Sequence, residues 1–376
     1  MSKIFFNRPN TVGNELEYLK QAIDNSHLSG DGDFTRRCHQ WLETNIGGHA
    51  LLTHSCTAAL EMGCLLANLQ PGDEVIMPSY TFVSTANAVA LRGAVPVFID
   101  IREDTLNLNE SLIESAITSK TKAIIPVHYA GVIAEMDRVN SIAKSHDLFV
   151  IEDAAQALLS TYHGRLAGTL GHAAAFSFHE TKNVLSGEGG ALIVKDIEIH
   201  HRAEIIREKG TNRSRFFRGE VDKYSWVDIG SSYLPSELIA AFLAAQLEQA
   251  REITQYRLEV CEQYRQAFTP LSRKGQIRLP IVPSHCTSNG HMFYLLLESM
   301  AARDSFIAAM KDAGIMTPFH YVPLHSSEAG VRLSRTSGPM NVTNDASARL
   351  VRLPVYYGVK SEQDRIIDVA LKALQN

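Results

Sequence analysis

Short apolar runs alternate with amphipathic segments between residues 49 and 195. The apolar runs predict strands, and the segments between them, with apolar residues at helical spacing, predict helices. The predicted strands are Ala50–Thr53, Glu74–Met77, Val95–Asp100, Ala123–Val127, Phe149–Glu152, Ala173–Phe178 and Ala191–Val194, and the predicted helices are Ala58–Asn68, Phe82–Leu91, Glu110–Ile117 and Met136–Ser145. This alternation is typical of an α/β fold with a mostly parallel central sheet.

The pattern changes after Ser236, where a long helical pattern runs from Glu237 to about Thr269. Beyond it the sequence predicts a smaller α+β unit with strands at His291–Leu297 and Thr317–His320 and helices at Ala302–Ala313 and Ser361–Leu374. We therefore expect a large domain over residues 1–250 and a small C-terminal domain over residues 251–376. The first 25 residues or so are candidates to pack beside the small domain.

Several of the predicted strands end in polar residues, namely Ser55, Ser79, His128, Asp153 and Ser177. In open α/β sheets the carboxyl ends of parallel strands meet at one edge, and ligands bind there. The sequence therefore predicts a site at this edge.

Asp153 and Lys182 carry the most specific chemistry at this edge. Asp153 follows the apolar run 148–151, where a buried carboxylate needs a cationic partner. Lys182 precedes the glycine-rich segment 187–190, which can turn tightly and hold a lysine over the sheet edge. Pyridoxal phosphate needs a lysine amine for its aldehyde and an acid facing its pyridine nitrogen, and these two residues would supply both. The alternatives are that Asp153 caps a helix and that Lys182 is a solvated loop lysine.

Three further segments fit the same cofactor. The junction at Ser55, Thr57 and Ala58 offers hydroxyls and free backbone N–H groups for a phosphate, although Thr57 would also serve as an ordinary N-cap. Phe82, at the next junction, is the candidate to stack on the pyridine ring, and core packing is its alternative. Gln156, one turn after Asp153, is a candidate cofactor contact or a surface amide.

Composition further narrows the range of partners, locations and site types that this chain can have. The 376 residues carry a net charge of −5, which gives no electrostatic reason to expect nucleic acid or a membrane surface. No stretch approaches the roughly 20 apolar residues of a membrane span, and the start of the chain lacks a signal-peptide pattern, so a cytoplasmic location is expected. The five cysteines form no CxxC pair, and neither a disulfide framework nor a metal site is indicated.

Taken together, these motifs resemble the DegT/DnrJ/EryC1/StrS family of sugar aminotransferases, which are fold type I pyridoxal phosphate enzymes. The resemblance covers essentially the whole chain and rests on Ser55–Leu60, Pro78–Asn87, Pro126–His128, Glu152–Gln156, Ser177–Lys182 with Gly187–Gly190, Ser236–Glu237 and Tyr321–His325. It implies that Lys182 forms the Schiff base, that Asp153 faces the pyridinium, that Gln156 contacts the cofactor and that Ser177, Thr57 and Ala58 hold the phosphate. It also implies a homodimer with the cofactor at the subunit boundary.

Within the family the chain looks closest to the dTDP-4-amino-4,6-dideoxygalactose transaminases of surface-antigen synthesis, through the segments 28–32, 209–214 and 229–234. This implies transamination from L-glutamate to dTDP-4-dehydro-6-deoxy-D-glucose, with the cofactor passing through its pyridoxamine form. Ser29, His179, His320 and Tyr321 are the candidates for substrate contact. Many members carry an Asn that reaches the partner's phosphate, and Ser232 stands in its position here.

Related activities remain as alternatives: a gluco product, amination at C3, a sugar dehydratase or a non-catalytic relative. Lys182 argues against the dehydratase, which in that family carries histidine at this position. The intact set of Asp153, Gln156, Ser177 and Lys182 argues against a non-catalytic protein. A nicotinamide dehydrogenase has no support, because no G-x-G-x-x-G motif follows a predicted strand.

Overall fold

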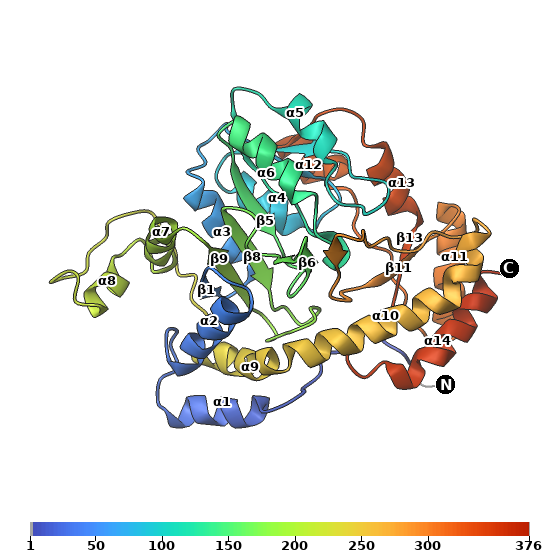
Figure 1. Cartoon of the computed structure of the whole chain (residues 1–376), viewed down its shortest axis with the longest axis horizontal. Coiled ribbons are helices and arrows are strands. Elements are labelled where there is room, and N and C mark those ends of the chain that lie inside the picture. The colour runs from blue at the N-terminus through green and yellow to red at the C-terminus, as the bar shows by residue number, and fades with distance from the viewer. Residues whose placement is uncertain (1–2, 376) are drawn as a thin grey trace.

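The computed structural model describes residues 3–375 and is built around an eight-stranded sheet with the order β1-β9-β8-β5-β4-β2-β3-β12 (Figure 1). Its strands are β1 (His49–Thr53), β2 (Glu74–Pro78), β3 (Val95–Ile99), β4 (Thr121–Ile124), β5 (Phe149–Asp153), β8 (Ala173–Ser177), β9 (Gly190–Val194) and β12 (Arg335–Thr336). The five pairings from β8 to β12 are parallel, and β9 pairs antiparallel with both β8 and β1. The mostly parallel sheet and its seven predicted strands are confirmed.

Helices cover both faces of this sheet because successive residues of each strand point to opposite sides. In β8, Ala174 and Phe176 pack with one group of helices, whereas Ala173 and Ala175 pack with the other. The first group is α2 (Asp33–Asn45), α5 (Ile113–Ala116), α6 (Met136–Ser145) and α9 (Glu237–Glu248), and the second is α3 (Cys56–Leu66), α4 (Val83–Ala90) and α7 (Ile197–Arg207). Because the strands are buried on both faces, their sequences are continuous apolar runs.

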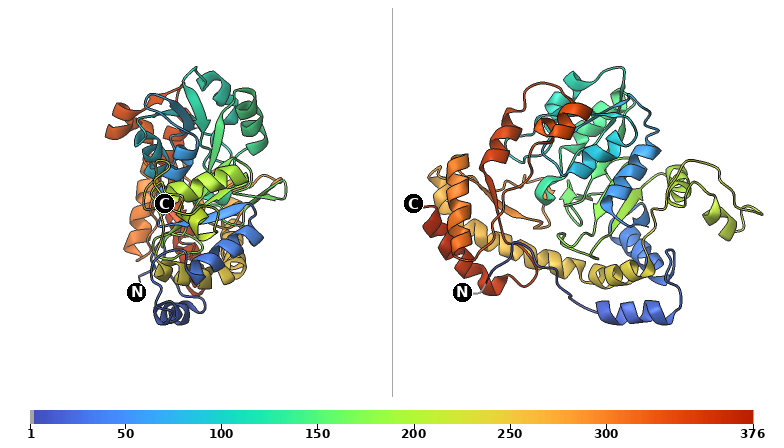
Figure 2. Two further views of the ribbon diagram at one scale, coloured as in Figure 1. Left: turned by 90° about the vertical axis from the view of Figure 1, so that its left-hand side faces the viewer. Right: turned by 180° about the vertical axis from the view of Figure 1, so that it is seen from behind.

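The C-terminal part has a core of its own. The long helix α10 (Ala250–Arg273) leads to the antiparallel pair β11 (Phe293–Leu296) and β13 (Leu350–Leu353), which packs with α11 (Met300–Asp312) and α14 (Lys360–Ala373) (Figure 1). Ile4 belongs to this core and its backbone pairs with Ile315. By contrast, α1 (Glu15–Asp24) packs on the outer side of α9 (Figure 2). The extreme N-terminal segment thus contacts the C-terminal core, and α1 contacts the sheet-bearing part.

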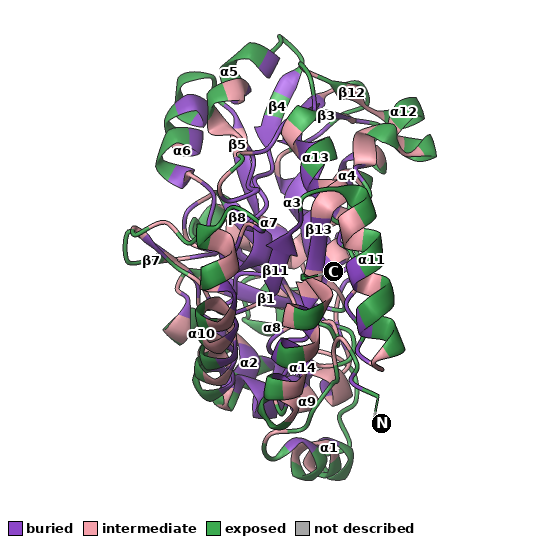
Figure 3. Ribbon diagram, turned by 90° about the vertical axis from the view of Figure 1, so that its right-hand side faces the viewer, coloured by how far each residue is buried: buried purple, intermediate pink, exposed green. Residues whose placement is uncertain are grey.

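The remaining elements are short. A small sheet contains β6 (Thr161–Tyr162), β7 (Arg165–Leu166) and β10 (Cys286–Thr287). The other helical segments are α8 (Arg213–Phe217), α12 (Glu328–Leu333), α13 (Asn341–Arg349) and the 3-10 turns Glu110–Leu112, Tyr129–Gly131 and Leu324–Ser326. Burial is concentrated in the two cores, as Figure 3 shows, and no helix in the described range 3–375 is long and apolar enough to cross a membrane.

Two predictions for the C-terminal half were wrong in detail. The helical pattern from Glu237 is broken at Gln249, whose backbone (φ −100°, ψ 6°) separates α9 from α10. Thr317–His320 forms no strand. Pro318 has no N–H and pairs with β13 only through its carbonyl, which accepts from the N–H of Arg352, and Phe319 forms a single bridge.

The segment 208–232 extends away from the body of the molecule and carries α8 (Figures 1 and 2). Several of its large apolar side chains are exposed, including Phe217 at 69% and Trp226 at 81%. Exposed apolar side chains that gather in one segment are typical of an interface. We refer to residues 208–232 as the arm.

A buried carboxylate fixes α2 against α9. Glu237 is 2% exposed, and its two oxygens accept hydrogen bonds from the backbone N–H groups of Gly32, Phe34 and Thr35 and from the Thr35 hydroxyl. These N–H groups open α2 and have no partner within the helix. A Cβ atom at position 32 would lie 2.5–2.7 Å from the Glu237 side chain, so a larger residue there would displace the carboxylate from these donors.

We predict that Glu237→Gln lowers the free energy of unfolding by about 2–3 kcal/mol, because the amide nitrogen would face backbone donors that are left unsatisfied. The measurement is urea denaturation followed by circular dichroism. Glu248→Gln, on the same helix, is the matched control: its carboxylate is 37% exposed and pairs with Arg37, so its loss should cost at most about 1 kcal/mol. Equal effects of the two changes would contradict the capping role.

Candidate active site

A cavity of about 800 Å³ lies where the sheet meets the C-terminal part of the chain. Loops that follow β1, β2, β5 and β8 line it from one side, and residues 318–321 with Arg352 line it from the other. Ten of the predicted site residues line this cavity: Ser55, Thr57, Phe82, Asp153, Gln156, Ser177, His179, Lys182, His320 and Tyr321. The structure therefore brings together residues that are far apart in the sequence.

Asp153 ends β5 and is 5% exposed. Its Oδ2 accepts a hydrogen bond of 2.7 Å from the Thr85 hydroxyl, which lies 2.8 Å from that of Thr81, and its Oδ1 accepts the N–H of Ala155 at 3.2 Å. No cation lies within ion-pair distance of Asp153 in the part of the chain that is described. A buried carboxylate with neutral donors only is suited to face a cationic ligand.

Lys182 lies in the loop that joins β8 to β9. Its backbone N–H donates to His179, while the N–H of Phe178 donates to Gly189 and closes the base of the loop. Within residues 3–375 the Lys182 amine has no hydrogen-bond partner. Desolvation lowers the pKa of this amine below its ordinary value, against the opposing effects of the Cys56 and Asp153 charges. A lowered pKa increases the fraction of neutral, nucleophilic amine.

The first turn of α3 forms an anion site beside Lys182. Ser55 is the N-cap, and its Oγ accepts the N–H of Ala58 at 3.1 Å. In the described structure the N–H groups of Cys56 and Thr57 have no acceptor, and the Thr57 hydroxyl lies 2.7 Å from that of Ser84. Free N–H groups, hydroxyls and the positive end of a helix dipole are the groups that bind a phosphate.

A glycine lets the two strand junctions approach each other. At Gly190, which begins β9, a Cβ atom would lie 2.4–2.5 Å from the backbone of Ser55 and Cys56. Any side chain there would push the end of the lysine loop away from α3. Gly190 therefore serves the close approach of two backbone segments, which differs from the tight turn expected of the glycine-rich segment.

Gln156 connects the sheet edge to the C-terminal part. Its Oε1 accepts the N–H of Ala130 at 2.7 Å and its Nε2 donates to the Tyr321 hydroxyl at 2.9 Å. The Tyr321 ring stacks on His320 with centroids 3.6 Å apart, and His320 Nδ1 lies 2.8 Å from the Tyr129 hydroxyl. Burial, with the Arg352 charge nearby, holds the pKa of His320 well below its usual range, so this imidazole is neutral.

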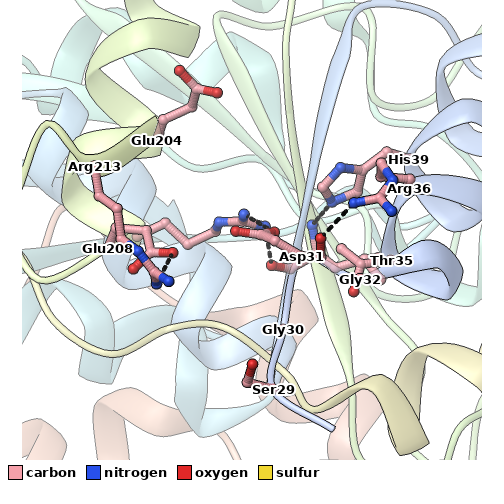
Figure 4. Close-up of polar contacts among 12 residues, drawn as sticks. Ser29, Gly30, Asp31, Gly32, Thr35, Arg36, His39, Glu204, Glu208 and Arg213 are labelled. Carbon is pink, nitrogen blue, oxygen red and sulfur yellow. Dashed lines mark hydrogen bonds and ion pairs between the residues drawn. The ribbon is translucent and has the colours of Figure 1, made fainter. Parts of the chain in front are cut away.

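Three predicted site residues do not line the cavity: Ser29, Ala58 and Ser232. Ser29 lies on the loop before α2 (Figure 4). It is exposed, and its hydroxyl lies 3.3 Å from His27 Nε2. The same loop is fixed by an ion pair between the half-buried Asp31 and the buried Arg207. Ser232 is exposed at the base of the arm, and its backbone bridges to Glu208. Their predicted roles remain predictions.

Sequence reasoning missed a second set of groups around the lysine. Asn183 donates through Nδ2 to the carbonyl of Asn289, and its Oδ1 lies 3.0 Å from His291 Nδ1. Asn289 in turn donates to the carbonyls of Gln156 and Leu158. This network ties the lysine loop to the loop after β5. The polar segment 287–291, which precedes an apolar strand, was a signal in the sequence for a loop at the sheet edge. No such signal marked Asn183.

A family model of known proteins matches residues 9–371 of the chain. The chain belongs to the DegT/DnrJ/EryC1/StrS aminotransferase family. Proteins of this family are pyridoxal phosphate-dependent enzymes, and this aminotransferase is one of them. The cavity fits the cofactor: the first turn of α3 suits its phosphate, Asp153 suits its ring N–H and Lys182 suits its aldehyde.

Curated relatives and solved structures resemble this aminotransferase over their whole length. It is 34% identical to the spore coat polysaccharide biosynthesis protein SpsC of Bacillus subtilis, with 96% of this chain and 94% of SpsC covered. It is 31% identical to the GDP-perosamine synthase of Caulobacter vibrioides, with 96% and 95% covered. The crystal structure of DesI in the presence of its TDP-sugar product has a TM-score of 0.89 at 28% identity, with 100% and 94% covered. These likenesses confirm the predicted fold class.

We predict that Lys182 in the cofactor-free aminotransferase reacts with formaldehyde and cyanoborohydride at a lower pH than an ordinary lysine does. The folded environment disfavours the ammonium form, so the neutral amine appears below the usual midpoint of about 10.4. Mass spectrometry of the modified peptide as a function of pH gives the midpoint. The chain unfolded in urea is the control, and a folded-state midpoint equal to or above the unfolded one would contradict the lowered pKa.

Proposed function

We propose that the chain transfers an amino group from L-glutamate to a nucleotide-linked 4-keto-6-deoxy sugar, with dTDP-4-dehydro-6-deoxy-D-glucose as the acceptor and dTDP-4-amino-4,6-dideoxy-D-galactose as the product. The observation that carries this proposal is the shared cavity of Lys182, Asp153 and the first turn of α3. Its volume of about 800 Å³ lies within the range of roughly 300–1,000 Å³ typical of small-molecule sites.

The relatives support a nucleotide-sugar acceptor. One is named for the synthesis of a GDP-linked amino sugar, one for a coat polysaccharide, and the DesI structure contains a TDP-sugar product. The identity of the nucleotide and the configuration at C4 rest on the resemblance of the segments 28–32, 209–214 and 229–234. Surface polysaccharide synthesis is the role that these names favour for this chain.

The roles of the chain's own residues follow from their positions. The bound cofactor supplies an aldehyde and an electron-withdrawing ring, whose positive charge the buried Asp153 carboxylate stabilises. Lys182 would be the acid–base group: its amine would take the proton from Cα of the donor in the first half-reaction and return one to C4 of the sugar in the second. Thr85 and Ala155 keep Asp153 oriented. Gln156 and Tyr321, joined by their hydrogen bond, position the C-terminal side of the cavity.

A homodimer with shared active sites is part of the same proposal. The arm extends from the body, and its exposed side chains Phe217 and Trp226 need a partner surface. Ser232 lies at the base of the arm outside its own cavity, in agreement with a contact to the phosphate of the second subunit. His179 and His320 are the proposed sugar contacts within one subunit, and Ser29 is a proposed substrate contact from the loop before α2.

We predict that Lys182→Ala abolishes multiple turnover of L-glutamate and the keto sugar, with a loss of at least about 10³-fold, because no other amine in the cavity can move the proton. The wild-type reaction is followed by absorbance of the cofactor and by NMR coupling constants of the product at C4. Wild-type protein that aminates C3, or that yields the gluco isomer, would correct the substrate assignment. Multiple turnover by the variant would refute the proposed mechanism.

A second prediction concerns the orientation of Asp153. Thr85→Val keeps the shape of the side chain but removes the 2.7 Å hydrogen bond to Oδ2, so kcat/KM and cofactor affinity should both fall about tenfold. Thr254→Val, on the exterior helix α10, is the matched control and should leave both unchanged. A cofactor affinity that stays within twofold of wild type at Thr85→Val would exclude this role for the hydroxyl.

A further inference from the structure

Tyr321 presents a phenol to the cavity from the wall opposite the sheet edge. It lines the cavity together with Phe319 and His320, whereas Lys182 comes from the loop after β8. The backbone of Tyr321 has a φ of 21°, a conformation that a bulky residue rarely adopts and that its surroundings must hold in place. A residue held in this way on a cavity wall is a candidate for a role in the reaction.

Contacts at both ends of Tyr321 hold this conformation. Its ring stacks on His320 with centroids 3.6 Å apart and meets Tyr80 edge-on at 5.6 Å. The Ser347 hydroxyl donates to the backbone carbonyl of Tyr321 at 2.9 Å. At the other end, Gln156 Nε2 donates to the phenol oxygen at 2.9 Å. The phenol is thus fixed at one place on the cavity wall.

The direction of the bond from Gln156 leaves the phenol's own proton free. Gln156 Oε1 accepts the N–H of Ala130 at 2.7 Å, so the amide nitrogen is the group that faces Tyr321. The phenol oxygen accepts this bond, and among residues 3–375 no group accepts its O–H. Burial and the nearby Asp153 charge raise the pKa of Tyr321, so the phenol keeps its proton at neutral pH. A neutral donor of this kind is suited to an acceptor atom of a ligand.

The reaction supplies such an acceptor in the carbonyl oxygen of the amino acceptor. An aminotransferase joins an amine to a carbonyl carbon, and the carbonyl oxygen leaves as water. Lys182 serves the carbon in the proposed reaction, and a second acid has to serve the oxygen. Because Lys182 and Tyr321 reach the cavity from opposite walls, a carbonyl group between them can turn its carbon to the amine and its oxygen to the phenol.

We propose that Tyr321 is a catalytic residue that protonates the carbonyl oxygen of the acceptor as this oxygen leaves. This inference rests on the proposed function. The C–O bond breaks while a C=N bond to the incoming amine forms, and the oxygen leaves as water. Tyr321 gives the oxygen one proton and regains one from the amine, so both protons of the water come from the amine overall. The same phenol serves the reverse event, in which water is added to release the 2-oxo acid.

The two half-reactions of the holoenzyme separate the steps at oxygen from those at carbon. For Tyr321→Phe we expect the second half-reaction, started from the aminated cofactor and the keto sugar nucleotide, to slow about 100-fold in maximal rate. Its apparent KM should change less than about threefold. Loss of cofactor absorbance with L-glutamate should also change less than about threefold, because transfer of the Cα proton precedes any step at oxygen. Release of 2-oxoglutarate should slow as much as the second half-reaction, and Tyr321→His, which keeps a ring and a donor, should recover part of the loss.

Equilibrium binding gives a readout that does not depend on turnover. A sugar nucleotide with a hydroxyl at C4 cannot react, but it offers the phenol an oxygen, and its 4-deoxy analogue does not. Calorimetry with the holoenzyme should show that Tyr321→Phe weakens binding of the 4-hydroxy compound about fivefold and leaves the 4-deoxy compound unchanged. Equal effects on the two compounds would contradict a contact between Tyr321 and the oxygen at C4.

Tyr264→Phe is the matched control. The Tyr264 hydroxyl donates to the carbonyl of Pro354 in the C-terminal core, outside the cavity, so both half-reactions should remain as in the wild type. The proposal is overturned if the second half-reaction of Tyr321→Phe is unchanged, or if loss of absorbance with L-glutamate slows equally. A shifted absorbance maximum of the resting variant would also overturn it, because the phenol would then contact the cofactor. If the wild type does not aminate the keto sugar nucleotide, the proposed acceptor fails, and release of 2-oxoglutarate still tests Tyr321.

Discussion

Two carboxylates follow one another at the end of β5, and the interior can hold them because each has its own set of donors. Glu152 is fully buried and accepts hydrogen bonds from His128 and from three backbone N–H groups of the loop 168–171. Burial by itself raises the pKa of Glu152, but these donors bring it below its ordinary value. Asp153 points to the opposite side of the strand and has neutral donors only. One acid is therefore structural, and the other is left for a cationic ligand.

This pair also sets the geometry of the rest of the site. The loop 168–171 leads directly into β8, which lies parallel to β5 and ends just before the lysine loop. Fixing that loop on Glu152 therefore fixes Lys182 relative to Asp153. On the other side of the sheet edge, the close approach at Gly190 fixes the first turn of α3 relative to the same loop. The acid, the amine and the anion site thus depend on neighbouring strands rather than on a flexible loop, which is how rigid catalytic geometry is usually obtained.

Sequence patterns predicted the parts of the site that depend on short segments. Asp153 and Lys182 each follow an apolar strand, and buried parallel strands have a strong signal, so their position at the sheet edge could be inferred. Contacts between segments that are far apart in the sequence could not be inferred in this way. The bonds between Asn183 and Asn289 join two loops 106 positions apart. The expected strand at Thr317–His320 was wrong because Pro318 and the turn after it limit pairing, a local effect that an apolar pattern does not contain.

The charges that line the cavity suit anionic ligands. Lys182, Arg257 and Arg352 line it, against Asp153 and the exposed Glu188. Arg257 is 3% exposed and donates to two backbone carbonyls, and burial lowers its pKa to about 10, so it remains cationic without a carboxylate. Burial also holds the pKa of His291 well below its usual range, which keeps this imidazole from adding a further positive charge. A phosphate at the first turn of α3 would neutralise part of this positive charge, and the helix N-terminus would add its own attraction for the anion.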